Sequence, residues 1–369
     1  MKTIGIGVVG TGDVALKLYL PELANLDREK AQLIALCDAD LARAERAQAM
    51  FGARRVYGDY RELVRDDEVD LVLDLTHHSM HFDVNLLAIE SGKSVYSEKP
   101  LATTFANADI LVKKANERNV MLASAPAIVL DPLVSETKKL YDDGALGKIC
   151  FARVHGSHEG ASLHGRYYDN AWYHKKSEGG GPLFDTGVYA LHTVTGVLGP
   201  AKRVVAFSSL CRPERYVGFV WQDEFEPYTM KIDADDNIVL MLDWGEGTFA
   251  QVDSSHCMLA SQGPWAEFYG TEGVVVSGAG EAPRNEGVPP LQIYQEDVKF
   301  GKRGWFKVYP SRGEKRWSIE QGVETAIDCM REGRKPLNSG EHARHVVEII
   351  ERARESAESG EILPLTSTF

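Results

Sequence analysis

A lysine and a proline close a short apolar segment at a place where a charged side chain could take part in catalysis. Residues 94–97 read Ser-Val-Tyr-Ser and are followed by Glu98, Lys99 and Pro100. The segment has the composition of a buried strand, and we interpret it as the fourth strand of a parallel sheet. Open α/β sheets bind ligands beyond the carboxyl ends of their strands, so Lys99 is expected to face a ligand. The alternative is a surface lysine that only closes a strand.

A glycine-rich turn near the start of the chain is a second chemical signature. An apolar, β-branched strand is expected to end at Val9, and residues 10–15 then read GTGDVA, which matches G-x-G-x-x-A. Gly10 permits the tight turn, and Gly12 lets the backbone approach a pyrophosphate. A helix is expected to follow and to end or kink at Pro21, and its first amide groups would face the phosphates.

An acidic residue after the second expected strand bears on which dinucleotide binds. Asp38 can accept hydrogen bonds from the adenosine ribose hydroxyls and would repel a 2′-phosphate. No arginine follows directly, because Ala39 and Asp40 come next. The sequence therefore favours NAD over NADP. Asp38 or Asp40 could also cap the helix expected over 41–50, and the two roles are compatible.

Strands and helices alternate regularly up to about residue 125, which predicts an α/β Rossmann domain with a doubly wound parallel sheet. Thr76 ends the third expected strand and should lie beside the cofactor. His77, His78 and His81 follow, but no H-E-x-x-H pattern and no acidic or cysteine partner at a ligand spacing accompanies them. We therefore predict no metal there. These histidines are expected to line the cofactor edge or to cap the next helix.

The pattern changes at about residue 126, and this change predicts two domains, 1–125 and 126–369. Longer strands joined by short connections predict an α+β domain with a large, mostly antiparallel open sheet. The expected strands are residues 149–155, 203–209, 236–243, 248–254 and 265–269, and the closing helices are 319–331 and 341–357.

A run of glycines introduces a helix with a polar stripe. Pro182 suits a first helical position, and the helix is expected to run to about Leu198. Asp185, Tyr189 and His192 then follow the i, i+4, i+7 spacing and share one face. A buried helix usually carries apolar side chains there, so the stripe indicates a site. A stripe that simply faces water is the alternative.

Taken together, these motifs resemble the Gfo/Idh/MocA family of oxidoreductases over nearly the whole chain. Residues 76–81 are similar to T-P-x-x-x-H with histidine in place of proline, and residues 92–100 are similar to G-K-x-V-x-x-E-K-P. Residues 144–148 resemble the usual start of the second domain, and residues 179–198 resemble G-G-G-x-L-x-D-x-G-x-[HY]. The resemblance implies an NAD(P)-dependent dehydrogenase that acts on the CH–OH group of a sugar, a sugar derivative or a cyclitol.

The resemblance also implies roles for the catalytic residues Lys99, Asp185, Tyr189 and His192. Lys99 would lie close to the nicotinamide and the reacting oxygen, and Asp185 would position Lys99 or the substrate. Tyr189 stands where the family often has histidine, so it is the first candidate for proton carrier and His192 is the second. A free tyrosine has a pKa near 10, and a nearby ammonium group would favour its phenolate.

The remaining candidates contact the cofactor or the substrate. The residues expected at the cofactor are Gly10, Thr11, Gly12, Asp13, Val14, Asp38, Thr76, His77, His81, Glu98 and Lys99. The residues expected at the substrate are Lys99, His155, Arg166, Trp172, Tyr173, Asp185 and Tyr189, with His158 as a weaker candidate. Trp172 and Tyr173 would pack on the apolar face of a sugar, or they are core aromatics.

Composition limits the class of partner. The chain has 369 residues and a net charge of -13, which argues against nucleic acid and anionic membranes. Five scattered cysteines favour reduced thiols in the cytoplasm, and the sequence predicts neither a secretory leader nor a membrane span. The resemblance implies a homodimer or homotetramer in which a second subunit covers the open sheet.

Two other activities remain open at this point. An NAD-binding sensor without turnover is one, and the intact set of Lys99, Asp185 and Tyr189 argues against it. The other is elimination or glycoside cleavage through transient oxidation, with a cofactor that stays bound.

Overall fold

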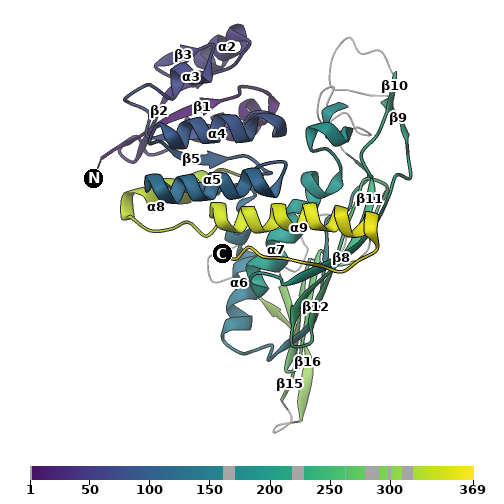
Figure 1. The fold of residues 1–369 in the computed structure, drawn as a ribbon. Coiled ribbons are helices and arrows are strands. Elements are labelled where there is room, and N and C mark those ends of the chain that lie inside the picture. Colours follow the sequence, from purple (N-terminus) through teal and green to yellow (C-terminus); the bar gives the residue numbers. More distant parts are fainter. Residues whose placement is uncertain are drawn as a thin grey trace. The chain divides into compact units, whose positions relative to one another are not determined.

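The chain folds into two compact units in a computed structural model (Figure 1). The structure describes residues 2–160, 171–217, 228–261, 263–278, 291–297, 301–309 and 319–369. Among the described residues, the first unit contains those up to Leu130 and residues 319–347. The second unit contains those from Asp131 to residue 309 and residues 348–369.

The first unit contains a parallel sheet of six strands in the order β3-β2-β1-β4-β5-β6. The strands are β1 (Ile4–Val9), β2 (Ala31–Cys37), β3 (Arg55–Tyr57), β4 (Leu71–Asp74), β5 (Ser94–Ser97) and β6 (Leu122–Ser124). The doubly wound parallel sheet predicted from the alternation is thereby confirmed. The strand before Lys99 is the fifth rather than the fourth, because β3 has only three residues and shows no clear apolar pattern.

Helices cover both faces of this sheet. Helices α4 (His81–Glu90) and α5 (Phe105–Arg118) lie side by side on one face (Figure 1). Val72 and Val95 point to the core under these helices, whereas Leu71 and Leu73 point to the opposite core. This alternation is what a strand buried on both faces requires. The other helical segments before residue 131 include α2 (Leu41–Phe51), α3 (Tyr60–Leu63) and the 3₁₀ turns His78–Met80 and Ala127–Leu130.

Helix α8 (Ile319–Glu332) belongs to the first unit, whereas the change of pattern in the sequence predicts a second domain over residues 126–369. Its residues Val323, Ala326 and Ile327 are buried in the same core as Leu71 and Leu73 of β4. An apolar helix face packs where matching apolar surface exists, and sequence order alone does not show where that is. Helix α9 (Gly340–Ser359) begins in the first unit and ends in the second.

The helix after the glycine-rich turn continues through Pro21 instead of ending there. A π-helical turn, Ala15–Tyr19, is followed directly by α1 (Leu20–Leu23), which contains the proline. Proline is tolerated here because the hydrogen-bond pattern of the helix changes from π to α just before it, where Leu20 N donates to Ala15 O. Wide turns of this kind often occur near functional sites.

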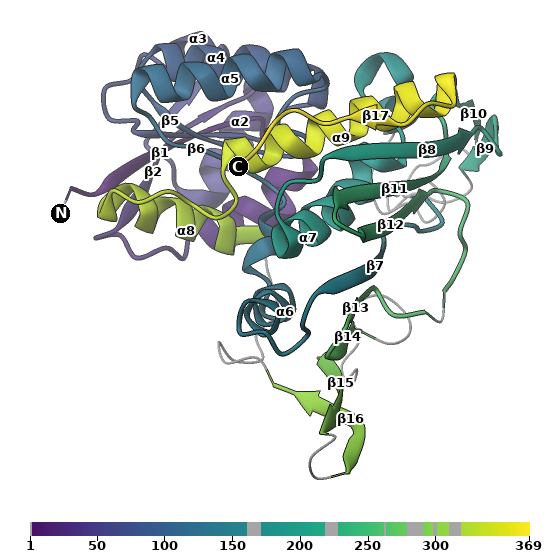
Figure 2. The same cartoon turned by 60° about the horizontal axis from the view of Figure 1, so that its bottom comes forward.

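The second unit contains a sheet of nine strands in the order β16-β15-β14-β13-β7-β12-β11-β8-β17. Most neighbours are antiparallel, as predicted, but β7 and β12 pair in parallel. The strands are β7 (Ile149–His155), β8 (Arg203–Ser209), β11 (Asn237–Gly245), β12 (Thr248–Ser255), β13 (Ala266–Gly270), β14 (Gly273–Ser277), β15 (Leu291–Asp297), β16 (Lys302–Val308) and β17 (Leu363–Pro364). Figure 2 shows β15 and β16 at one end of this sheet.

Other elements of this unit bound the sheet. A two-stranded ribbon consists of β9 (Glu214–Val217) and β10 (Tyr228–Lys231), and the helices are α6 (Pro132–Asp142) and α7 (Val188–Leu198). Helix α7 packs against β7 and β12. None of the helices in the described ranges is long and apolar enough to cross a membrane.

Candidate active site

The glycine-rich turn after β1 uses its two glycines differently. Gly10 has φ +93°, and a Cβ added to it would lie 2.7 Å from the carbonyl oxygen of Leu75. A side chain is therefore excluded there by the neighbouring strand end. A Cβ added to Gly12 would meet no atom within 4 Å, so Gly12 borders open space. An open approach to the backbone at the second glycine is what a pyrophosphate requires.

The helix that follows offers amide groups at its start. The first helical hydrogen bond runs from Leu16 N to Gly12 O at 2.9 Å, so the amides of Asp13 and Val14 have no intrahelical acceptor. Unused amides at a helix start suit a phosphate group. The Asp13 carboxylate itself pairs with Lys17 at 3.3 Å.

Asp38 is fixed by the same turn. Its Oδ2 accepts hydrogen bonds from the Thr11 amide at 2.9 Å and from the Thr11 hydroxyl at 3.0 Å. Its Oδ1 accepts from the amide of Asp40 at 2.9 Å, and Asp40 in turn caps α2 by accepting from the amide of Ala42. The two acidic residues thus divide the roles that the sequence left open. Asp40 caps the helix, and Asp38 faces the glycine-rich turn.

Thr76 and His81 connect the ends of β4 and β5. The buried Asp74 accepts from the amide and the hydroxyl of Thr76, at 3.1 and 2.6 Å. His81 is completely buried, and its two ring nitrogens lie 2.6 Å from Pro100 O and 3.1 Å from Thr76 O. Burial is the largest effect on Asp74 and raises its pKa. The imidazole of His81 therefore connects the loops that follow β4 and β5, and its place at the cofactor edge stays a prediction.

The other two histidines of this segment diverge from His81. His77 is exposed and His78 is buried, and the ring centroids of His78 and His81 are 5.8 Å apart.

Glu98 fixes the backbone of Lys99. Its Oε2 accepts from the Lys99 amide at 2.9 Å, and its Oε1 accepts from the hydroxyl of Tyr19 at 2.6 Å. Tyr19 belongs to the helix that follows the glycine-rich turn, so this carboxylate ties that helix to the end of β5. Only 8% of Lys99 is exposed. A buried ammonium at a strand end is suited to binding a polar group of a ligand.

These residues gather at one edge of the first sheet. Gly10, Asp38, Asp74 and Lys99 come at or just after the ends of the adjacent strands β1, β2, β4 and β5. Parallel strands bring their carboxyl ends to the same edge, which is the ligand-binding edge of doubly wound folds. An open glycine turn, a helix start and an acidic residue on the next strand together fit a dinucleotide.

Asp185 of the second unit lies on a π-helical turn, Leu183–Gly187, that precedes α7. The residue spacing predicts a regular helix from Pro182 with Asp185, Tyr189 and His192 on one face. Asp185 and Tyr189 are half-buried, whereas His192 is only 1% exposed. The wide turn changes the angular relation between Asp185 and the residues of α7, and His192 lies among the buried residues of that helix.

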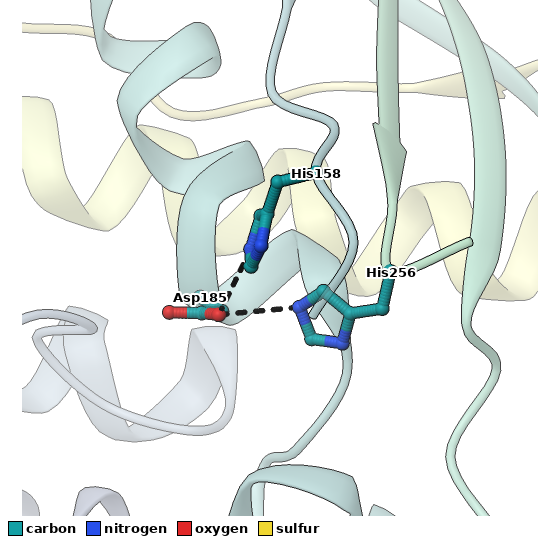
Figure 3. A group of neighbouring side chains, drawn as sticks. All are labelled: His158, Asp185 and His256. Atoms are coloured by element: carbon teal, nitrogen blue, oxygen red, sulfur yellow. Dashed lines mark hydrogen bonds and ion pairs between the residues drawn. The ribbon is translucent and has the colours of Figure 1, made fainter. Parts of the chain in front are cut away.

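Two histidines converge on Asp185 (Figure 3). His158 Nε2 and His256 Nε2 lie 3.3 and 3.1 Å from the same oxygen, Oδ2. His158 follows β7 and His256 follows β12 directly. His256 was missed by the sequence analysis. Its position one residue after a strand of polar and apolar alternation is the signal that could have found it.

The other predicted substrate residues lie around this group or outside the described residues. His155 Nδ1 lies 2.5 Å from Asp253 Oδ1, on the parallel partner strand. Tyr173 lies in the 3₁₀ turn Ala171–His174 and is half-buried. Arg166 and the side chain of Trp172 lie outside the described residues.

His174 is a further buried histidine of this region. Its ring centroid is 5.5 Å from that of His256, and only 2% of His174 is exposed. Burial lowers the pKa of His174 to about 3, and the nearby His256 and Arg215 add to this effect. Burial likewise lowers the pKa of His256, although Asp185 opposes the change. Both rings are therefore neutral at neutral pH.

Models of known protein families match residues in both units of the chain. Residues 4–125 match an oxidoreductase family with an NAD-binding Rossmann fold, GFO_IDH_MocA. Residues 134–276 match the GFO/IDH/MocA C-terminal domain. Two models of one family thus follow each other along the chain in the order in which the units occur.

Among curated proteins, the chain is similar to trans-1,2-dihydrobenzene-1,2-diol dehydrogenases. The rabbit (Oryctolagus cuniculus) protein is 32% identical over 184 residues, which are 50% of this chain and 54% of that protein. The zebrafish (Danio rerio) protein is 31% identical over 206 residues, 56% of this chain and 59% of that protein. The chain thus spans a little over half the length of the curated relatives it matches.

Solved structures show the same fold. A levoglucosan dehydrogenase in complex with NADH and L-sorbose is 22% identical, has a TM-score of 0.84 and covers 100% of both chains. An aldose–aldose oxidoreductase from Caulobacter crescentus, complexed with glycerol, is 20% identical with a TM-score of 0.79, over 99% of this chain and 100% of that one. At these identities the likeness concerns the fold alone.

The two glycines of the turn predict different defects. Gly10→Ala should lower the free energy of unfolding by about 1–3 kcal/mol, because the side chain meets Leu75 O at a positive φ. Gly12→Ala should change stability by less than about 1 kcal/mol but weaken NAD binding, because its methyl group enters open space. Urea denaturation and a fluorescence titration with NAD measure the two effects. Unchanged NAD affinity in Gly12→Ala would contradict a cofactor role for the turn.

His174 predicts a dependence of stability on pH. In the unfolded chain a histidine titrates near its ordinary value of 6.5, whereas the folded value is about 3. The unfolded chain therefore binds the proton first, and stability falls as the pH drops from 6.5 toward 3, by up to about 1.4 kcal/mol per pH unit. His174→Gln should make this dependence shallower in urea denaturation at pH 7 and pH 5. The exposed His77→Gln is the control, and equal slopes in both variants would contradict the assignment.

Proposed function

The chain belongs to the GFO/IDH/MocA family of oxidoreductases, and from this premise we propose that it is a dehydrogenase that oxidises a secondary alcohol with NAD. One observation supports the proposal most directly: three features follow adjacent parallel strands at one edge of the first sheet. They are the open turn at Gly12, the ribose-binding candidate Asp38 and the buried Lys99. This is the residue set that nicotinamide chemistry needs in a doubly wound fold.

The proposed chemistry removes a hydride from the alcohol carbon and a proton from its oxygen. Bound NAD supplies the hydride acceptor. Lys99 binds the reacting oxygen through its ammonium group, and its backbone is held by Glu98. Tyr189 takes the hydroxyl proton, since it is half-buried whereas His192 is almost completely buried. General base assistance of this kind contributes roughly 10²- to 10⁴-fold.

The proposed substrate is a ring that carries a secondary alcohol beside another hydroxyl group. The relatives named for trans-1,2-dihydrobenzene-1,2-diol and those named for levoglucosan and aldoses share this feature. Sugars, sugar derivatives and cyclitols all present it. NAD is proposed over NADP because Asp38 faces the glycine-rich turn and no arginine follows it.

We also propose that the protein is cytoplasmic and forms a homodimer or homotetramer. The five cysteines are all thiols in this structure, which suits a reducing compartment. Phe207, Val239, Met241 and Phe249 are 82%, 38%, 36% and 43% exposed on β8, β11 and β12. Apolar side chains gathered on one sheet face favour a protein partner there.

The proposal is tested by following NADH formation at 340 nm across a panel of ring alcohols. The panel contains aldoses, levoglucosan, inositols and trans-1,2-dihydrobenzene-1,2-diol, with NAD and NADP in parallel. Turnover with NAD supports the proposal and identifies the ring. Binding of NAD without any turnover would instead favour the sensor. If NAD remains bound to the protein through purification and no net NADH forms during turnover, elimination or glycoside cleavage is favoured instead.

Lys99→Met is the first mutational test. It removes the ammonium group and keeps most of the aliphatic stem, so kcat should fall by about 10²- to 10⁴-fold while NAD affinity stays within about threefold. Initial-rate kinetics measure kcat, and a titration with NAD measures its affinity. Lys113→Met, on the exposed side of α5, is the matched control. Turnover like that of the wild type in Lys99→Met would overturn the role of this lysine.

Asp38→Ala tests the choice of dinucleotide. Loss of a charged acceptor for ribose hydroxyls should weaken NAD by about 10- to 100-fold and NADP much less. Asp40→Ala removes the cap of α2 and an exposed ion pair with Arg43, and it should cost about 1 kcal/mol of stability without changing the NAD/NADP ratio. Titrations of both variants with both dinucleotides give the ratio. An equal loss for NAD and NADP in Asp38→Ala would remove Asp38 from this selection.

A further inference from the structure

We propose that His158 and His256 are positioning residues that hold Asp185 as an oriented carboxylate, and that the buried Arg215–Asp236 pair holds the two histidine loops. We call Asp185, His158 and His256 the carboxylate clamp. The inference rests on the proposed function, because Asp185 is the residue that the family resemblance assigns to positioning Lys99 or the substrate. The clamp itself is a matter of hydrogen bonding and can be tested without a substrate.

Parallel pairing brings the two histidines together. β7 and β12 are parallel neighbours, so the segments after their carboxyl ends lie at the same edge. The His158 amide donates to Ser255 O at 2.8 Å, which ties these segments to each other. A Cβ added to Gly156 would lie 2.9 Å from Gly187 Cα. Close contact between two glycines therefore lets the turn that carries Asp185 approach both histidines.

The hydrogen bonds of His158 define its tautomer. Its Nδ1 accepts from the amide of Gly160 at 3.0 Å. A ring nitrogen that accepts a hydrogen bond carries no proton, so the proton of the neutral ring lies on Nε2. Nε2 is the atom that faces Asp185 Oδ2 at 3.3 Å. His158 thus places its protonated ring nitrogen beside the carboxylate at ion-pair distance, whereas the hydrogen bond to Oδ2 comes from His256.

His256 reaches the same result by a different argument. Burial lowers its pKa, so the ring is neutral and has one N–H group. Its Nδ1 is buried and has no hydrogen-bond partner among the described residues, while its Nε2 lies 3.1 Å from Asp185 Oδ2. An ionised carboxylate oxygen only accepts, so the proton belongs on Nε2. Figure 3 shows both contacts converging on one oxygen, with the other oxygen pointing away from the rings.

A metal ion is the competing interpretation of these three residues. One ligand atom from each lies within 4.8 Å of the others, which a metal centre also requires. A metal would need the lone pair of His158 Nε2, but then Nδ1 would carry the proton and point it at the amide of Gly160. Histidines that bind metals normally donate their second N–H to an acceptor, and neither ring has one among the described residues. The geometry therefore favours hydrogen bonds.

Arg215 supports the clamp from behind. It is 2% exposed, and its Nη1 donates to Glu159 O at 3.3 Å and to His256 O at 2.9 Å. One guanidinium group thus holds both histidine segments by their backbones. Its Nη2 donates to Asp236 Oδ2 at 3.0 Å, in a pair that is almost completely buried. A Cβ on Gly160, at φ +93°, would lie 2.8 Å from Arg215 Nη1. The absence of a side chain at Gly160 therefore lets the guanidinium group approach this backbone segment.

Asp236 balances the charge of Arg215. Burial alone would raise the pKa of Asp236, but hydrogen bonds from the amides of Cys211 and Arg212, from Cys257 and from Arg215 hold it below its usual range. The arginine is therefore paired with an ionised partner. A buried ion pair whose Nη1 and Nη2 atoms are hydrogen-bonded has a restricted geometry, and this restrains the two backbones that carry the clamp.

The clamp gives Asp185 a defined direction and charge. The hydrogen bond from His256 and the His158 N–H group beside it favour the carboxylate over the carboxylic acid and restrain its rotation. The direction in which the second oxygen accepts hydrogen bonds is thereby set. Under the proposed function, this oxygen orients a hydroxyl group of the substrate, which is the type of control that positioned carboxylates exert in active sites.

The first test reads the tautomers directly, without any substrate. In protein labelled with [¹⁵N]histidine, long-range ¹H–¹⁵N spectra at pH 7.5 distinguish Nε2–H from Nδ1–H rings. His158→Gln and His256→Gln assign the two signals. Both rings are expected as neutral Nε2–H forms that ZnCl₂ and MnCl₂ at one equivalent leave unchanged. An Nδ1–H form for either ring, or stoichiometric metal bound in elemental analysis, would overturn the clamp whether or not turnover is found.

The second test uses the substrate identified by the panel. His256→Leu removes the donor, so kcat should fall by roughly tenfold or more and the acidic limb of the kcat/KM profile should move to higher pH by about one unit. His256→Gln keeps an N–H near the position of Nε2 and should restore most of both values. Leu259→Ser, exposed in the same segment, is the control and should leave them unchanged. An acidic limb that stays in place in His256→Leu, or fails to return in His256→Gln, would contradict the positioning role.

Discussion

Parallel pairing of neighbouring strands is the constraint that brings the candidate residues at the strand ends of both sheets together. In the first sheet it brings the ends of β1, β2, β4 and β5 to one edge, where the glycine-rich turn and Lys99 lie. In the second sheet, which is mostly antiparallel, the pair β7 and β12 does the same for His158 and His256. Antiparallel neighbours would send these segments to opposite edges.

Carboxylates with several donors make each site rigid. The half-buried Asp38 and Glu98 and the buried Asp236 each accept hydrogen bonds from more than one donor on different segments. Loss of such donors costs free energy, most of all for the buried Asp236, so the segments that donate are held in one arrangement. Through these carboxylates the residues that could do chemistry are fixed by backbone amides rather than by long side chains alone.

Residues without side chains decide where the backbones come close. Gly10 packs against Leu75 O, and Gly156 packs against Gly187. Both approaches place a turn or a helical segment at a strand end. The π turn Ala15–Tyr19 follows Gly10, and Gly187 is the last residue of the π turn Leu183–Gly187. A Cβ at any of these positions would push apart the elements that carry the candidate site residues, since interiors are closely packed.

The sequence by itself determined the architecture of both units, because apolar periodicity and turn residues are local properties. It also determined the turn at residues 10–15, Asp38 and Lys99 as neighbours of strand ends, since G-x-G-x-x-A has one structural meaning between a strand and a helix. Only the tertiary structure decided that α8 packs with the first unit, that His81 holds two loops, and that His256 faces Asp185. These depend on contacts between residues far apart in the chain. A local pattern can place a residue at a strand end, but it does not show which distant residue the side chain meets.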